Sequence, residues 1–173
     1  MLYTGHGDAG YTHVIGGDSL PKSDARLEAL GALDEAQAHL GLARALLTGT
    51  QWHSSIMRVQ ADLRLLMGDI ATVTSRTAYL TNDHLQALES DLQAWDALTG
   101  GFTGFTAPGN TVSGAHLHLA RTVIRRAERK IVALFQGGNS VNSLTLTYLN
   151  RLSSWVYALC LLVDSPTLTE AVA

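Results

Sequence analysis

The segment between residues 106 and 134 carries an apolar stripe with the period of an α-helix, and it constrains the fold more than any other part of the chain. The stripe consists of Leu117, Ala120, Val123, Ile124, Ala127, Ile131 and Leu134. Residues three or four positions apart share one face of an α-helix, so this spacing predicts a helix that packs against other helices. The segment therefore favours a helical bundle over a sheet.

The same predicted helix presents charged residues on a second face. At about 100° per residue, Arg121, Arg125 and Glu128 fall within roughly 60° of one another. Two guanidinium groups beside a carboxylate suit a polyanionic ligand that is held next to an acid. A solvated basic face on an amphipathic helix is the alternative interpretation of this cluster.

Helical periodicity recurs in four other segments, which turn residues separate. We expect these helices at about 24–47, 53–73, 83–98 and 141–163, and the arginine-rich helix ends at Gly137-Gly138-Asn139. Thr81-Asn82-Asp83 and Ser140 supply the expected N-caps of the third and fifth helices. Because no segment alternates between apolar and polar residues as a strand does, we expect no sheet.

The sequence thus predicts an all-α protein, a mostly antiparallel five-helix bundle over residues 24–164. Residues 1–23 are rich in glycine and lack a sustained period, so we expect an ordered loop or a flexible leader there. Residues 165–173 are expected to form a fraying tail.

The composition excludes several classes of protein. Cys160, the single cysteine, lies in an apolar run that indicates burial and a reducing compartment. A formal net charge of −3 gives no general attraction for nucleic acid. The chain shows neither a basic and apolar leader nor an apolar stretch of about 18 residues, so we expect a soluble, cytoplasmic protein without a membrane partner. His116 and His118 point to different sides of a helix, and we expect no metal site.

Polar residues elsewhere extend the predicted anion site. Gly7, Gly10, Thr12 and Lys22 could surround a phosphate, because glycines let backbone N–H groups approach an anion. Asp34 lies on or beside the apolar stripe of the first helix, where a carboxylate requires a cation such as Arg121 or Arg125. Asn150 is expected near the inner side of the last helix. Exposed helix surface is the alternative for Asp34 and Asn150.

Together these motifs resemble the PduO-type ATP:cob(I)alamin adenosyltransferases over nearly the whole chain. The matching blocks are T-x-x-G-D-x-G-x-T at 4–12, G-x-x-D-E at 31–35, F-x-x-P-G at 105–109, A-x-L-H-x-A-R-T-V-x-R-R-A-E-R at 115–129 and Y-L-N-R-L-S at 148–153. The arginine-rich block is the longest and the most specific. The resemblance implies a five-helix bundle that assembles as a homotrimer and binds ATP between adjacent subunits, with a corrinoid beside it.

The reaction implied by this resemblance transfers the 5′-deoxyadenosyl group of Mg·ATP to the cobalt of a reduced corrinoid, giving adenosylcobalamin and triphosphate. An adenosylcobalamin-dependent acceptor enzyme is an implied partner. Matched residue by residue, the resemblance assigns ATP binding to Arg125, Glu128 and Asn150, and an ion pair across the subunit contact to Arg121 and Asp34. The residues that it implies close over the phosphates are Thr4, Gly7, Asp8, Gly10, Thr12 and Lys22. Phe105 would displace the lower axial ligand of cobalt.

The N-terminal segment departs from the family pattern. Gly5 and His6 stand where the family usually has a basic residue and a threonine. Each lost hydrogen bond to a charged group costs about 1.5–3 kcal/mol, so fewer cations at the phosphates would weaken ATP binding. A corrinoid- or nucleotide-binding carrier on the same fold, without transferase activity, is therefore the alternative function.

Overall fold

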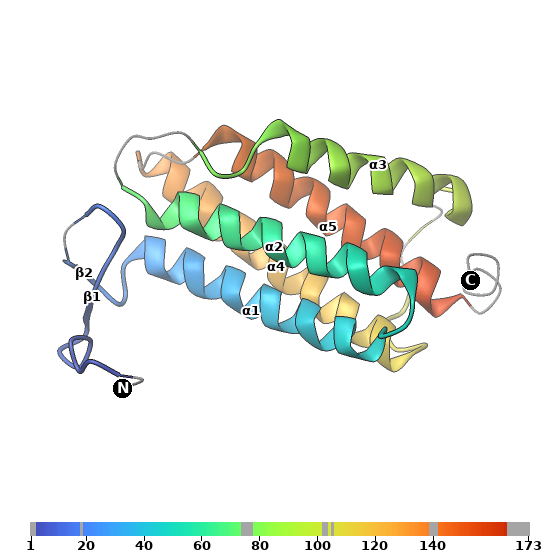
Figure 1. Ribbon diagram of the computed structural model, residues 1–173, viewed down its shortest axis with the longest axis horizontal. Helices are drawn as coiled ribbons and strands as arrows, with labels where there is room; N and C mark the ends of the chain where they lie inside the picture. Colours follow the sequence, from blue (N-terminus) through green and yellow to red (C-terminus); the bar gives the residue numbers. More distant parts are fainter. Residues whose placement is uncertain are drawn as a thin grey trace.

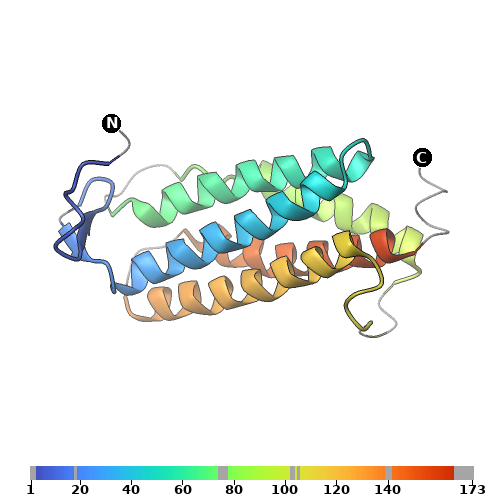
Figure 2. The same cartoon turned by 90° about the horizontal axis from the view of Figure 1, so that it is seen from below.

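Five long helices make up most of the computed structural model, which describes residues 3–17, 19–73, 78–101, 104, 106–138 and 142–165. The helices are α1 (Ala25–Leu46), α2 (Gln51–Ala71), α3 (Asn82–Thr99), α4 (Val112–Gln136) and α5 (Ser143–Asp164). They lie lengthwise in one elongated bundle (Figure 1, Figure 2). The predicted all-α five-helix bundle is confirmed.

The helices form a chain of neighbours that differs from their order in the sequence. α1 packs against both α2 and α4, and α5 packs against both α4 and α3. The pairs α1–α2, α1–α4 and α4–α5 run antiparallel, whereas α3 and α5 run in the same direction (Figure 1). The bundle is therefore mostly antiparallel, and α2 and α3 lie at the two ends of this chain of neighbours.

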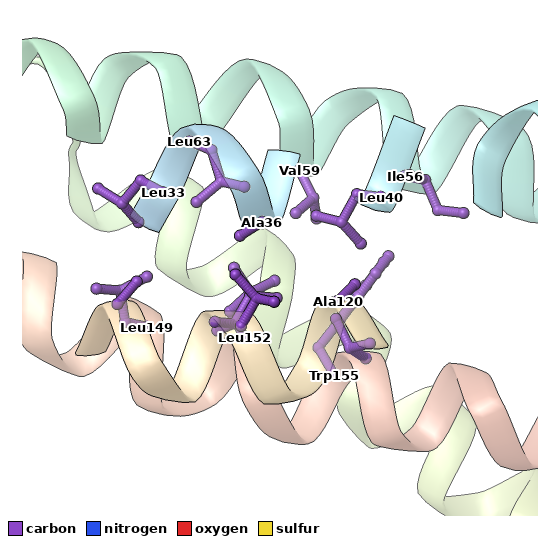
Figure 3. Close-up of a cluster of buried hydrophobic side chains, with 14 of the residues drawn as sticks. Leu33, Ala36, Leu40, Ile56, Val59, Leu63, Ala120, Leu149, Leu152 and Trp155 are labelled. Carbon is purple, nitrogen blue, oxygen red and sulfur yellow. The ribbon is translucent and has the colours of Figure 1, made fainter. Parts of the chain in front are cut away.

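One apolar face of each of these helices faces a common core. Figure 3 shows side chains of α1, α2, α4 and α5 that meet there. The labelled residues are Leu33, Ala36, Leu40, Ile56, Val59, Leu63, Ala120, Leu149, Leu152 and Trp155. Every residue of the stripe in α4, from Leu117 to Leu134, is buried, as its helical spacing predicts.

The helix ends depart from the predictions by up to two residues, and one cap differs. Thr81 is the N-cap of α3, as expected, and its N–H donates to Nδ1 of His84 at 3.2 Å. α5 begins later than predicted, because Asn142 caps it and accepts a hydrogen bond from the N–H of Leu144 at 3.1 Å. The predicted cap, Ser140, lies outside the described residues. Serine and asparagine are comparable N-caps, so composition alone does not separate them.

A short hairpin, not predicted, occupies the N-terminal segment. Strands β1 (Tyr11–His13) and β2 (Ser19–Pro21) pair antiparallel. Strands of three residues are too short for an alternating pattern to be detected. The N–H of Ile15 donates to the carbonyl of Ala71 at 3.0 Å, and the N–H of Val73 donates to the carbonyl of Ile15 at 3.2 Å. The hairpin is thereby attached to the end of α2.

Buried and partly buried polar groups fix α5 against α2 and α3. The hydroxyl of Tyr148 donates to Asp62 at 2.8 Å, and the indole N–H of Trp155 donates to Asp91 at 2.8 Å. Arg58 of α2 is ion-paired with Asp91 of α3. Burial raises the pKa of the Asp62 carboxyl, although the Tyr148 hydroxyl opposes the shift. Three helices are therefore held in register by this cluster.

By length and composition alone, α5 could cross a membrane. No other helix in the described ranges meets these criteria. However, 56% of its most apolar window is buried inside the bundle. Cys160 of α5 is fully buried, as predicted, and burial raises the pKa of its thiol to about 12. These features are typical of a core helix.

Replacing Gly114 by alanine should lower the free energy of unfolding by about 1–3 kcal/mol. A Cβ at this position would lie 2.0 Å from Oδ1 of Asp164. That oxygen accepts hydrogen bonds from the N–H and the hydroxyl of Thr111, the N-cap of α4. The new methyl group would displace the carboxylate and break these bonds. Chemical denaturation measures the effect, and in an Asp164→Ala background Gly114→Ala should cost little. An equal cost in both backgrounds would contradict this explanation.

Candidate functional site

The charged face of α4 opens into a pocket of about 400 Å³ between α3, α4 and α5. Its polar lining consists of Asp96, Thr99, Arg121, Arg125, Ser153, Ser154 and Tyr157, and its apolar lining includes Leu92, Ala158 and Leu161. This volume is within the usual range of small-molecule pockets. Two guanidinium groups on one wall and hydroxyl groups on another suit a ligand that carries both anionic and neutral polar groups.

Arg121 and Arg125 both line this pocket, as the predicted helix face requires. Arg125 is exposed, and Arg121 is partly buried against Tyr157, with its guanidinium carbon 5.8 Å from the centroid of that ring. The buried Nε of Arg121 has no hydrogen-bond partner among the described residues. Both guanidinium groups can therefore donate to a ligand or to another subunit.

Glu128 and Asn150 meet on the surface between α4 and α5. The Asn150 Nδ2 donates to Glu128 Oε1 at 3.2 Å, and its Oδ1 accepts from Arg151 at 2.9 Å. The structure thus brings these two predicted ATP ligands together, one helical turn from Arg125. The prediction that Asn150 lies near the inner side of its helix is wrong, because the residue is exposed.

Asp34 is also exposed, whereas its neighbour Leu33 is buried. No ion pair joins Asp34 to Arg121 or Arg125 within the described part of one chain. The carboxylates of α1 that pair with α4 are Glu35, bound to Arg126, and Glu28, bound to Lys130 at 2.7 Å. The pairing of Asp34 with Arg121, which the resemblance implies across a subunit contact, therefore stays a prediction.

The predicted phosphate residues of the N-terminal segment lie at the end of the bundle where α1 begins (Figure 1). Thr4, Asp8, Gly10 and Lys22 are exposed, and Gly7 and Thr12 are partly buried. Gly7 and Lys22 are close together, since a Cβ at Gly7 would lie 3.0 Å from the Lys22 ammonium nitrogen. None of these six residues lines the pocket. Phe105 lies outside the described residues.

Sequence reasoning missed the contributions of α3 and α5 to the pocket, since Asn150, the predicted site residue of α5, does not line it. On α5, the polar residues Asn150, Ser153, Ser154 and Tyr157 recur at spacings of three and four. This spacing predicts one polar face of a helix and could have indicated the second wall. Asp96 follows an apolar stripe that ends at Trp95, and nothing in its local pattern separates it from ordinary helix surface.

His118 lies behind the pocket and is only 3% exposed. Its ring packs edge-on against Tyr157, with centroids 6.1 Å apart, and neither ring nitrogen has a hydrogen-bond partner in the described structure. Burial, together with the positive charge of Arg121, lowers the pKa of His118, and Asp164 opposes the shift. The imidazole is therefore neutral in the folded protein at pH 7. No group of three or more metal-ligating side chains occurs in the described ranges.

Acidification from pH 7.5 to 5.5 should destabilise the protein, and His118→Gln should reduce this effect. The unfolded chain binds a proton on His118 near pH 6.5, whereas the folded chain resists protonation. The stability that the neutral imidazole contributes is present above pH 6.5 and is lost as the pH falls through the lowered pKa. Melting temperatures across this range measure the loss. Parallel pH profiles for the two proteins would contradict the assignment.

Two solved structures with the same fold are complexed with ATP, and one of them also with cobalamin. A variant of a PduO-type ATP:corrinoid adenosyltransferase from Lactobacillus reuteri, complexed with cobalamin and ATP, is similar with a TM-score of 0.87 and 29% sequence identity. The match covers 95% of this chain and 91% of that one. Another variant of the Lactobacillus reuteri enzyme, complexed with ATP, is similar with a TM-score of 0.85 and 30% identity, covering 95% and 94% of the two chains.

Sequence comparisons agree with the structural ones. The chain is 36% identical to a corrinoid adenosyltransferase of Bacillus subtilis over 169 residues, which is 95% of this chain and 86% of the relative. It is 32% identical to the corrinoid adenosyltransferase PduO of Salmonella typhimurium over 95% of its length, but it spans only 50% of that longer relative. The family model described as cobalamin adenosyltransferase matches residues 2–163. This chain therefore belongs to the cobalamin adenosyltransferase family.

Proposed function

We propose that the protein is an ATP:corrinoid adenosyltransferase, which transfers the 5′-deoxyadenosyl group of ATP to the cobalt of a reduced corrinoid. The observation that carries this proposal is the pocket that contains Arg121 and Arg125, beside the Glu128–Asn150 pair. This arrangement lies on the fold of relatives complexed with cobalamin and ATP.

The chemistry requires little acid or base catalysis from the protein. Cobalt(I) attacks C5′ of the ribose, the cobalt–carbon bond forms, and the bond from C5′ to oxygen breaks as triphosphate leaves. The protein must orient C5′ and stabilise the negative charge that grows on the triphosphate. We assign charge stabilisation to Arg125, and ATP positioning to Glu128 and Asn150. Mg²⁺ enters as the complex with ATP.

A homotrimer would complete the site. Within one chain, the residues predicted to bind phosphate lie away from the pocket, so a second subunit is the proposed source of the N-terminal segment that closes over ATP. Arg121 and Asp34 form no ion pair within the described part of one chain. We propose that they form one across the subunit contact. We place the reaction in the cytoplasm and expect an adenosylcobalamin-dependent enzyme to accept the product.

Anaerobic mixing of the protein with cob(I)alamin and Mg·ATP tests the proposal. The expected result is the absorption spectrum of a cobalt–carbon bond, formed only when ATP is present. Tight corrinoid binding without this spectrum would instead support the carrier function, which the departures at Gly5 and His6 favour. Absence of both binding and turnover would refute the two functions together.

A further inference from the structure

The hydroxyl of Tyr157 joins α5 to the segment between α3 and α4. It donates a hydrogen bond to the carbonyl of Gly104 at 2.6 Å and accepts one from the N–H of Thr106 at 3.2 Å. A phenol has one donor and can accept as well, so these two bonds are compatible. Tyr157 is only 9% exposed, and it lines the pocket together with Arg121 and Arg125.

The described part of the anchored segment is rich in glycine. Gly101, Gly104 and Gly109 all have positive φ angles, between 81° and 142°, which glycine adopts without strain. Within the described structure, the hydrogen bonds of Gly104 and Thr106 to other elements are both made with Tyr157. A single hydroxyl therefore fixes two backbone positions beside the pocket.

The ring of Tyr157 restrains Arg121 as well. The guanidinium lies 5.8 Å from the ring centroid, close enough for a cation–π contact. The buried Nε of Arg121 has no hydrogen-bond partner in the described structure. The cation–π contact with Tyr157 therefore restrains the Arg121 side chain where a hydrogen bond does not. The ring of His118 also packs edge-on against Tyr157, with centroids 6.1 Å apart.

We propose that Tyr157 is a positioning residue for the corrinoid half of the reaction. Its hydroxyl fixes the backbone at residues 104 and 106, and its ring orients Arg121. Phe105, to which the resemblance assigns the displacement of the axial ligand of cobalt, lies between the two anchored residues in the sequence. The inference rests on the proposed function, and it predicts that losing the hydroxyl impairs the cobalt chemistry more than ATP binding.

The variant Tyr157→Phe tests this role, because it removes the hydroxyl and keeps the ring. Hydrogen exchange of the Thr106 amide, measured by NMR, should accelerate about tenfold, the scale of one lost hydrogen bond. Turnover with cob(II)alamin and a reductant should fall about tenfold, while the KM for ATP stays within about twofold. With pre-reduced cob(I)alamin the loss should be smaller.

Tyr148→Phe is the matched control. It also removes a buried hydroxyl of α5, but the lost hydrogen bond goes to Asp62, away from the pocket. This variant should melt at a lower temperature and keep both the wild-type exchange of the Thr106 amide and the wild-type ratio of cob(II)alamin to cob(I)alamin rates. An equal change of that ratio in both variants would overturn the role of Tyr157.

Two further outcomes separate this inference from the proposed function. Unchanged Thr106 exchange in Tyr157→Phe, or full cob(II)alamin turnover, would overturn the positioning role while leaving the transferase function intact. An inactive wild-type protein would refute the transferase function alone. In that case a spectroscopic titration with cob(II)alamin decides the inference, because equal affinities of the wild type and Tyr157→Phe would overturn it.

Discussion

Arg125→Ala should reduce ATP-dependent adenosylation at least about a hundredfold while the bundle stays folded. Arg125 is exposed on α4 and lines the pocket, so its removal leaves the core intact. A donor that is aimed at developing negative charge contributes about 2.7–4 kcal/mol to a transition state, which corresponds to a hundredfold loss or more. Steady-state kinetics measure the loss, and circular dichroism reports whether the helices persist.

Arg129→Ala is the matched control for this prediction. Arg129 is an exposed arginine one turn further along α4, and it does not line the pocket. It should retain activity within about twofold, since an exposed charge contributes little at this distance. Equal losses in the two variants would mean that the basic character of α4, and not the position of Arg125, supports turnover. Full activity of Arg125→Ala would remove this residue from the mechanism.

Asp34→Asn and Arg121→Ala should each reduce turnover about ten- to a hundredfold, and the double variant should be little worse than either. Partners in one ion pair show this non-additivity, because the second substitution removes a contact that is already broken. Asp34 pairs with neither pocket arginine within the described chain, so the prediction requires a second subunit. Light scattering should show weaker assembly in the same variants.

The pair Glu35→Gln and Arg126→Ala supplies the comparison for this cycle. These residues form an ion pair between the same two helices, but within one chain and on an exposed surface. Such pairs contribute about 0–1 kcal/mol, and their loss should change turnover little. If the losses of Asp34→Asn and Arg121→Ala were instead additive, the two side chains would not be in contact.

The sequence by itself determined the helices and much of the charged face. Helix ends were predicted from apolar residues at spacings of three and four. Each predicted end lies within two residues of the observed one. This succeeds because burial of one face is a local property of a helix and leaves a local pattern. The common face of Arg121 and Arg125 follows from the same geometry, and both residues line the pocket.

Only the tertiary structure decided which surfaces meet. Each residue of a helix is turned by about 100° from the one before it. Asp34, predicted on or beside the apolar stripe, and Asn150, predicted near the inner side, are therefore exposed beside buried neighbours. Asp96 of α3 and Tyr157 of α5 both line the pocket because these two helices pack against each other. The spacing of polar residues on α5 indicates a polar face there, but the neighbour of that face depends on contacts between residues far apart in the chain. The physical reason is that the spacing of residues along one helix determines which of them share a face, whereas the packing of the helices determines which neighbour that face contacts.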